Sequence, residues 1–170
     1  SEAAPSLLPQ LAEELPPRLN ESTGTTKKPP GPIAFEMEEE LGQVAEALGG
    51  SQARSLLLIG PPGSGKTALV RELARRRREF GFVGAPFWST SGSRLMPGQV
   101  GFGMWQQRCR ELCTEAARTR AILHLGRLLE WTEVGKADRG DPSAGSVLRP
   151  AIARGDILTI AEGTPEDLAV

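Results

Sequence analysis

The sequence lacks several residues and patterns that mark common classes of protein. It contains no tyrosine, two cysteines and one histidine in 170 residues. Two cysteines do not make the disulfide framework of a small secreted domain, and one histidine leaves too few soft ligands for a zinc site. No apolar run approaches the roughly 18 residues of a membrane span, and residues 1–5 lack the features of a signal peptide. We therefore expect a soluble cytoplasmic protein without a membrane partner.

The chain also lacks an excess of charge of either sign. Twenty basic and 21 acidic residues give a net charge of -1, so nothing overall marks a binder of nucleic acid. A run of four arginines, residues 75–78, is the exception. No aromatic residue stands within it, and its charge is favourable at the end of a helix. We expect a solvated face or a subunit contact there, and no nucleic-acid partner.

Prolines divide the chain into two parts. Seven of them interrupt every helical run in the first 32 residues: Pro5, Pro9, Pro16, Pro17, Pro29, Pro30 and Pro32. This pattern predicts a proline-rich linker over residues 1–32 and a folded domain over residues 33–170.

Apolar runs alternate with helical spacing through the domain. The runs predict strands at residues 55–59, 85–90, 121–125 and 157–161, and helices at 35–48, 67–79, 103–118 and 144–154. The first strand is continuously apolar, which is typical of a strand buried on both faces. The alternation predicts an α/β fold with a parallel sheet of about four strands flanked by helices.

The eight residues that follow the first strand fit the phosphate-loop pattern GxxxxGK followed by Ser or Thr. They are Gly60, Pro61, Pro62, Gly63, Ser64, Gly65, Lys66 and Thr67. Glycines let backbone N–H groups turn inward around phosphate oxygens, and a helix N-terminus favours an anion. Lys66 would reach the β- and γ-phosphates, and the Thr67 hydroxyl would bind Mg²⁺. The alternative is a glycine turn that binds nothing.

Three further segments resemble the first nucleotide-binding domain of the Clp-type AAA+ unfoldases and disaggregases. They are residues 38–48, residues 95–108, and the stretch LRPAIARGDI at 148–157, which is similar to the family's LKPALARGEL. The resemblance covers about residues 33–168. It implies the large subdomain of an AAA+ P-loop NTPase, with ATP and Mg²⁺ as cofactors. It also implies a protein partner or polypeptide substrate, and a homo-oligomer in a longer parent protein.

The third strand departs from the family where the family has its catalytic acids. Family members end this strand with an Asp-Glu pair; the Asp holds the Mg²⁺ shell and the Glu polarises the attacking water. Gly126 and Arg127 stand there in this chain. Loss of a positioned general base typically forfeits about 10²–10⁴-fold in rate. Glu162, after the last strand, is the candidate substitute, with a solvated loop glutamate as the alternative; we assign no other catalytic residue.

Other departures concern the substrate loop, the adenine pocket and the sheet edge. Residues 100–103 replace the family's pore tyrosine, and Phe35 is our candidate to pack on adenine. The chain stops at Val170, before the family's fifth strand and helical lid. We therefore expect no lid subdomain and a phosphate-loop strand at an uncovered sheet edge.

Three functions stay open at this point. The first is an ATP-binding AAA+ module of a Clp-like chaperone that hydrolyses ATP weakly or not at all. The second is an active Clp-like ATPase that remodels proteins with non-standard carboxylates. The third is a nucleotide-independent protein-interaction or assembly module. The intact loop favours the first two, and the missing acids weigh against the second.

Overall fold

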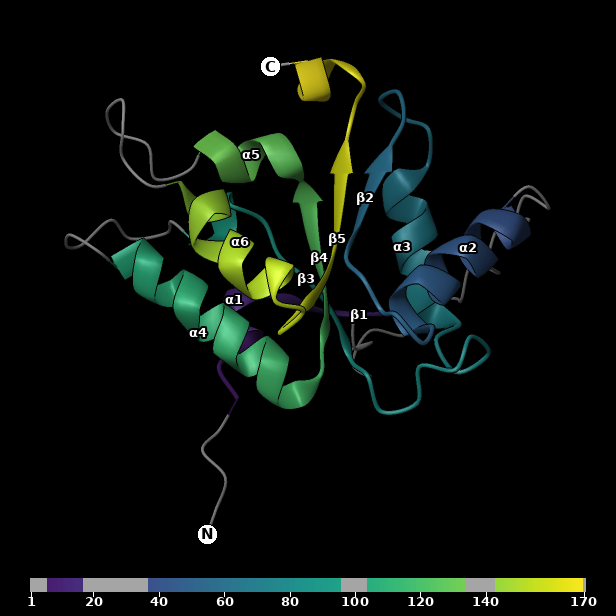
Figure 1. Cartoon of the computed structure of the whole chain (residues 1–170), viewed down its shortest axis with the longest axis horizontal. Coiled ribbons are helices and arrows are strands. Elements are labelled where there is room, and N and C mark those ends of the chain that lie inside the picture. Colours follow the sequence, from purple (N-terminus) through teal and green to yellow (C-terminus); the bar gives the residue numbers. More distant parts are fainter. Residues whose placement is uncertain (1–5, 17–36, 96–103, 134–142, 170) are drawn as a thin grey trace, which may run out of the picture.

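A five-stranded sheet lies between two layers of helices (Figure 1). The computed structural model describes residues 6–16, 37–95, 104–133 and 143–169. Two predicted features, the adenine contact of Phe35 and the loop at residues 100–103, lie outside these ranges. The strands are β1 (Glu13–Leu15), β2 (Leu56–Ile59), β3 (Phe87–Ser89), β4 (Ile122–Arg127) and β5 (Leu158–Gly163).

The sheet has the order β1-β3-β4-β5-β2. β2, β5, β4 and β3 pair in parallel, and β1 adds to β3 in the antiparallel sense. The predicted α/β fold with about four parallel strands is confirmed. β2 and β3 lie within their predicted ranges, and β4 and β5 overlap theirs and continue two residues further. All four parallel strands therefore end at the same edge of the sheet.

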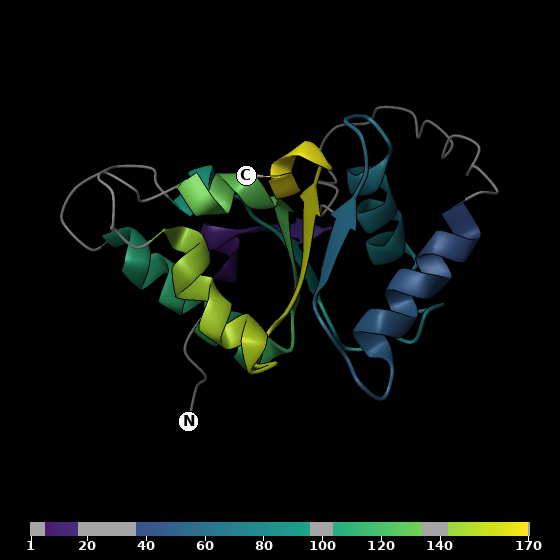
Figure 2. The same ribbon diagram turned by 45° about the horizontal axis from the view of Figure 1, so that its top comes forward.

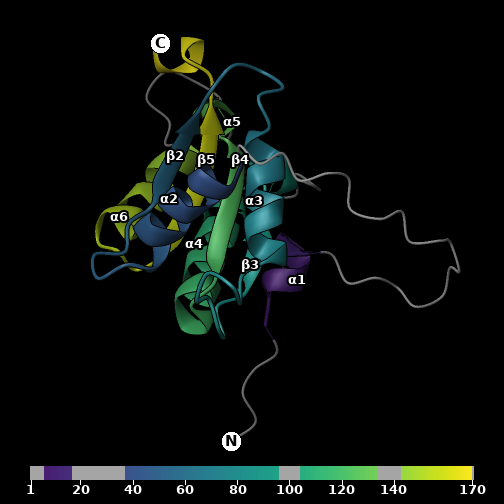
Figure 3. The ribbon, with the colours of Figure 1, turned by 90° about the vertical axis from the view of Figure 1, so that its right-hand side faces the viewer.

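Helices cover both faces of the sheet. On one face lie α2 (Met37–Gly49) and α3 (Lys66–Arg75), which Figure 3 shows in front of the strands. On the other lie α4 (Met104–Thr119), α5 (Leu128–Glu133) and α6 (Ala144–Ala153), as the turned view of Figure 2 shows. Each face has its own apolar core. In the described ranges no helix is long and apolar enough to cross a membrane.

The N-terminal segment differs from the predicted linker. Residues 8–15 form α1 (Leu8–Leu11) and β1, and they bury Leu8, Leu11 and Leu15 against the domain. The linker interpretation is wrong for this stretch, because its prolines stand where helices and strands tolerate them. Pro9 lies in the first turn of α1, where its missing N–H has no helical partner to lose. Pro16 follows the end of β1.

The phosphate-loop strand β2 is an edge strand, as the resemblance implied, because β5 is its only neighbour among the described residues. The expectation that it is buried on both faces is wrong. Leu56 and Leu58 pack into the core beneath α2 and α3, but Leu57 and Ile59 are 37% and 43% exposed. A continuous apolar run is typical of a central strand, and here it occurs at an edge.

Candidate functional site

The loop between β2 and α3 has the backbone that its glycines permit. Gly63 and Gly65 adopt φ values of +76° and +88°, in the left-handed region that glycine enters at little cost. At Gly60 a Cβ would lie 2.7 Å from the Ser64 Oγ, so the Ser64 side chain would have to turn away from a larger residue. The predicted pattern over residues 60–67 therefore folds into one tight turn that opens a helix.

The first turn of α3 offers donors for an anion. Gly65 is the N-cap residue, and no side chain caps the helix, so the N–H groups of the first turn keep donor capacity. The Lys66 Nζ folds back over the loop and donates to the carbonyl oxygens of Gly60 at 2.6 Å and Pro61 at 3.0 Å. The first amides of α3 and the Lys66 ammonium group thus belong to one short segment of the chain.

Thr67 and Glu162, which are 95 positions apart in the sequence, meet beside this loop. The Thr67 hydroxyl donates to both carboxylate oxygens of Glu162, at 2.8 and 3.0 Å. Glu162 belongs to β5 and is only 8% exposed. The alternative of a solvated loop glutamate is therefore wrong, because the strand continues to Gly163 and turns this side chain toward α3.

Two polar residues that the sequence analysis did not select extend the contact. The ring nitrogen Nε2 of His124, on β4, bonds to Glu162 Oε2, and its Nδ1 lies 2.8 Å from the Ser89 Oγ on β3. We call Ser89, His124, Glu162 and Thr67 the polar chain. It crosses three neighbouring strands, at the end of β3, in the middle of β4 and near the end of β5. Open parallel sheets bind ligands at the carboxyl ends of their strands. The signal for it was the lone histidine inside the apolar strand 121–125.

The polar chain keeps Glu162 ionised. Burial is the largest single influence and raises the pKa of this carboxyl, but hydrogen bonds from His124 and Thr67 and nearby positive charge, including that of Lys66, together outweigh it. The net pKa lies below the ordinary value of 4.5. An ionised carboxylate only accepts, so His124 Nε2 carries the hydrogen; in the neutral ring Nδ1 then accepts from the Ser89 hydroxyl.

The end of β4 offers no carboxylate. The ladder to β5 is irregular between His124 and Gly126, and Gly126 has a φ of +65°. Arg127 turns to Asp167, with its Nη2 2.8 Å from Oδ1. That hydrogen bond and one from the Thr164 N–H lower the pKa of Asp167 to about 2. The described residues hold no group of three or more His, Cys, Asp or Glu side chains that could bind a metal by themselves.

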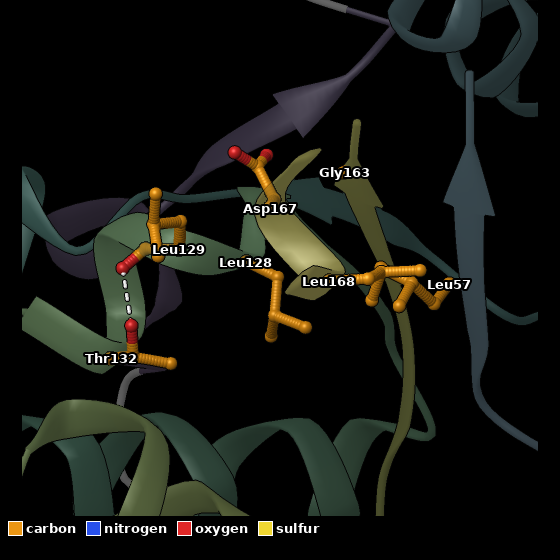
Figure 4. Close-up of a pocket in the computed structure, with 7 residues that line it drawn as sticks. All are labelled: Leu57, Leu128, Leu129, Thr132, Gly163, Asp167 and Leu168. Atoms are coloured by element: carbon orange, nitrogen blue, oxygen red, sulfur yellow. Dashed lines mark hydrogen bonds between the residues drawn. The ribbon is translucent and has the colours of Figure 1, made fainter. Parts of the chain in front are cut away.

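A separate cavity of about 260 Å³ lies at the same end of the sheet (Figure 4). It is lined by Leu57, Leu128, Leu129, Thr132, Gly163, Asp167 and Leu168. Leucines make up most of the lining, and its charged member, Asp167, is an anion. The cavity therefore does not suit phosphate, and the loop of residues 60–67 is the candidate phosphate site.

Comparison with known proteins defines the class of this fold. The pattern of the family described as "AAA ATPase domain" matches residues 35–161. The chain belongs to this family, and the predicted P-loop NTPase fold is confirmed.

Its relatives include Clp-type proteins. The chain is 33% identical over 140 residues to "Chaperone protein ClpB 2" of Parasynechococcus marenigrum, covering 76% of this chain and 15% of that protein. It is 31% identical over 133 residues to the ATP-binding subunit ClpE of the ATP-dependent Clp protease from Lactococcus lactis, covering 75% and 18%. The fold matches the S. cerevisiae Hsp104-ADP complex with a TM-score of 0.64 at 23% identity, over 81% of this chain and 24% of that one. The resemblance to a Clp-type AAA+ module is confirmed, and the chain spans less than a fifth of either curated relative.

Proposed function

We propose that the chain is the nucleotide-binding module of a Clp-like chaperone, and that it binds ATP with Mg²⁺ and hydrolyses it weakly or not at all. The observation that carries the proposal is the loop of residues 60–67. Helix α3 begins there without a side-chain cap, and the Lys66 side chain folds back over the same turn. Family membership supports ATP as the nucleotide.

The loop can exchange its present contacts for phosphate. Lys66 bonds to neutral carbonyl oxygens, and hydrogen bonds between two charged groups are stronger than these. An anionic phosphate oxygen therefore competes well for the ammonium group. The first N–H groups of α3 would complete the cradle, because a helix N-terminus attracts negative charge.

The Thr67 hydroxyl beside the loop fits Mg²⁺. It is a hard oxygen ligand, which this ion prefers, and the ion usually shares such sites with substrate phosphates. Bound there, the ion would neutralise charge on the β- and γ-phosphates. The chain's own residues hold the phosphates and orient the oxygen donors.

Weak hydrolysis follows from the lack of a free carboxylate that could activate water. Gly126 and Arg127 stand where the family has its acids, and neither can take a proton from water. The carboxylate of Glu162 is already bonded to His124 and Thr67, so it is poorly placed as a general base. Nucleotide would then act as a ligand that stabilises one conformation or assembly.

Partners and location follow from the relatives. One solved structure that resembles the chain is an S. cerevisiae Hsp104:casein complex, 25% identical over 81% of this chain with a TM-score of 0.64. By analogy, we propose that the parent protein contacts a polypeptide, forms a homo-oligomer and resides in the cytoplasm. We propose no nucleic-acid or membrane partner.

The test is a titration of a fluorescent ATP analogue with Mg²⁺ against the chain and its Lys66→Ala variant. We expect saturable binding, weakened roughly tenfold or more without the lysine, because that corresponds to one lost charged contact. Arg71→Ala is the matched control, since Arg71 is an exposed cation on the same helix. Absence of saturable binding, or equal binding by Lys66→Ala, would contradict the proposal.

A further inference from the structure

Glu162 requires an explanation beyond folding. A buried carboxylate is costly unless it is paired, and here β3 and β4 supply the pairing through Ser89 and His124. Apolar residues would fill the same space without that requirement. The buried carboxylate lies directly beside the phosphate loop, against the one hydroxyl in it that is expected to bind a cation.

We propose that Glu162 supplies the carboxylate of the Mg²⁺ shell beside Thr67, in place of the acid that the end of β4 lacks. The proposal rests on the proposed binding of nucleotide at residues 60–67. It assigns Glu162 to the metal shell and leaves the activation of water without a residue, which agrees with weak hydrolysis.

The direction of the carboxylate supports this role. Both of its oxygens lie within hydrogen-bond distance of the Thr67 hydroxyl. The carboxylate therefore faces the hydroxyl that we expect to contact the cation. A carboxylate has about four acceptor sites; the one hydrogen of the Thr67 hydroxyl is shared between its two oxygens, and His124 bonds to Oε2. At least one site therefore remains for the ion or for a water molecule bound to it.

His124 acts here as a positioning residue. Its Nε2 holds Oε2 of the carboxylate, and Ser89 in turn fixes the orientation of the ring. Metal-site carboxylates are commonly oriented by such outer hydrogen bonds, and loss of one typically costs about 10–100-fold in metal affinity.

Because Glu162 is a single carboxylate, Mg²⁺ should bind well only together with nucleotide. The described part of the chain has no cluster that holds a metal without further ligands, and phosphate oxygens would complete the shell. The expected signature is therefore a nucleotide affinity that rises with Mg²⁺, and this measurement does not depend on turnover.

The experiment compares the affinity for a fluorescent ATP analogue in Mg²⁺ and in EDTA. In Glu162→Gln, which keeps the size of the side chain, we expect the Mg²⁺ enhancement to fall by roughly tenfold or more. Affinity in EDTA should be unchanged or tighter, because a negative charge near the phosphates is gone. Glu166→Gln, an exposed glutamate four residues further on, is the matched control and should keep the full enhancement.

The outcomes separate the two proposals. Nucleotide binding with an unchanged Mg²⁺ enhancement in Glu162→Gln overturns the role of Glu162 and leaves the proposed function standing. Absence of binding by the unsubstituted chain overturns both. If circular dichroism shows Glu162→Gln to be unfolded, Glu162→Asp decides instead. It keeps the charge but is one methylene shorter, so a reduced enhancement supports the proposal and a full one overturns it.

Discussion

Replacing His124 with leucine should destabilise the fold, and most of the loss should disappear when Glu162 is replaced as well. The carboxylate is 8% exposed, and in the single variant it would keep only the hydrogen bond from Thr67. The Ser89 hydroxyl also loses its partner. In the double variant His124→Leu with Glu162→Leu, no buried charge is left.

The size of the effect follows from the contacts that are lost. A hydrogen bond to a charged group contributes about 1.5–3 kcal/mol, and an ordinary one about 1 kcal/mol. His124→Leu should therefore lower the free energy of unfolding by about 2–4 kcal/mol. Glu162→Leu leaves the His124 N–H buried without an acceptor, at a cost of about 1–3 kcal/mol. Thr67 is exposed and can turn to water, so the double variant should lose less than the sum, with a coupling near 2 kcal/mol.

The unsubstituted chain, the two single variants and the double variant form a double-mutant cycle. Urea unfolding at neutral pH measures the free energy of unfolding of each, with the midpoints compared at constant slope. Arg154 and Asp156 form a matched exposed pair, with Nε 2.9 Å from Oδ2 and side chains 65% and 47% exposed. A cycle on that pair should show coupling close to zero. Strictly additive losses for His124→Leu and Glu162→Leu would refute the buried pair and, with it, the positioning role of His124.

Two further predictions test other parts of the structure. Leu8→Ala should lower the free energy of unfolding by about 2–4 kcal/mol, because Leu8 is 1% exposed in the core. Leu168→Ala, at 57% exposure, should leave the urea midpoint nearly unchanged, and an equally small effect at Leu8 would restore the linker interpretation. Asp167→Asn should lower the melting temperature at neutral pH, since the pKa of Asp167 falls from 3.8 to about 2 on folding. A carboxyl whose pKa is lowered by folding stabilises the folded state at pH values above its unfolded pKa. That stabilisation is lost as the pH falls through the folded pKa. The difference from the unsubstituted chain should therefore shrink between about pH 4 and pH 2, and a constant difference would contradict the Arg127 contact.

Local patterns were enough for the phosphate loop and for most of the secondary structure. A tight turn with a fixed backbone conformation needs glycine at defined positions, so the glycine spacing alone predicts its structure. The same holds for α4 and α6, where hydrophobic periodicity reports which face is buried, and for β4 and β5, whose apolar runs are buried at consecutive positions. The short helix α5 was not predicted, because six residues carry too little periodicity. It is anchored by Trp131, which is fully buried and donates to the Leu125 carbonyl at 2.6 Å.

By itself the sequence determined the class of fold, the loop pattern at residues 60–67 and the presence of Gly126 and Arg127 after the third strand, because each is a property of adjacent residues. Only the tertiary structure decided the fate of residues separated along the chain. It pairs residues 13–15 with β3, exposes Leu57 and Ile59 of β2, and brings Glu162 to Thr67 across 95 positions and to His124 across 38. Such contacts depend on strand order and register, which no local pattern encodes. For that reason the carboxylate beside the phosphate loop could be suspected from the sequence, but its partners could be found only in the folded chain.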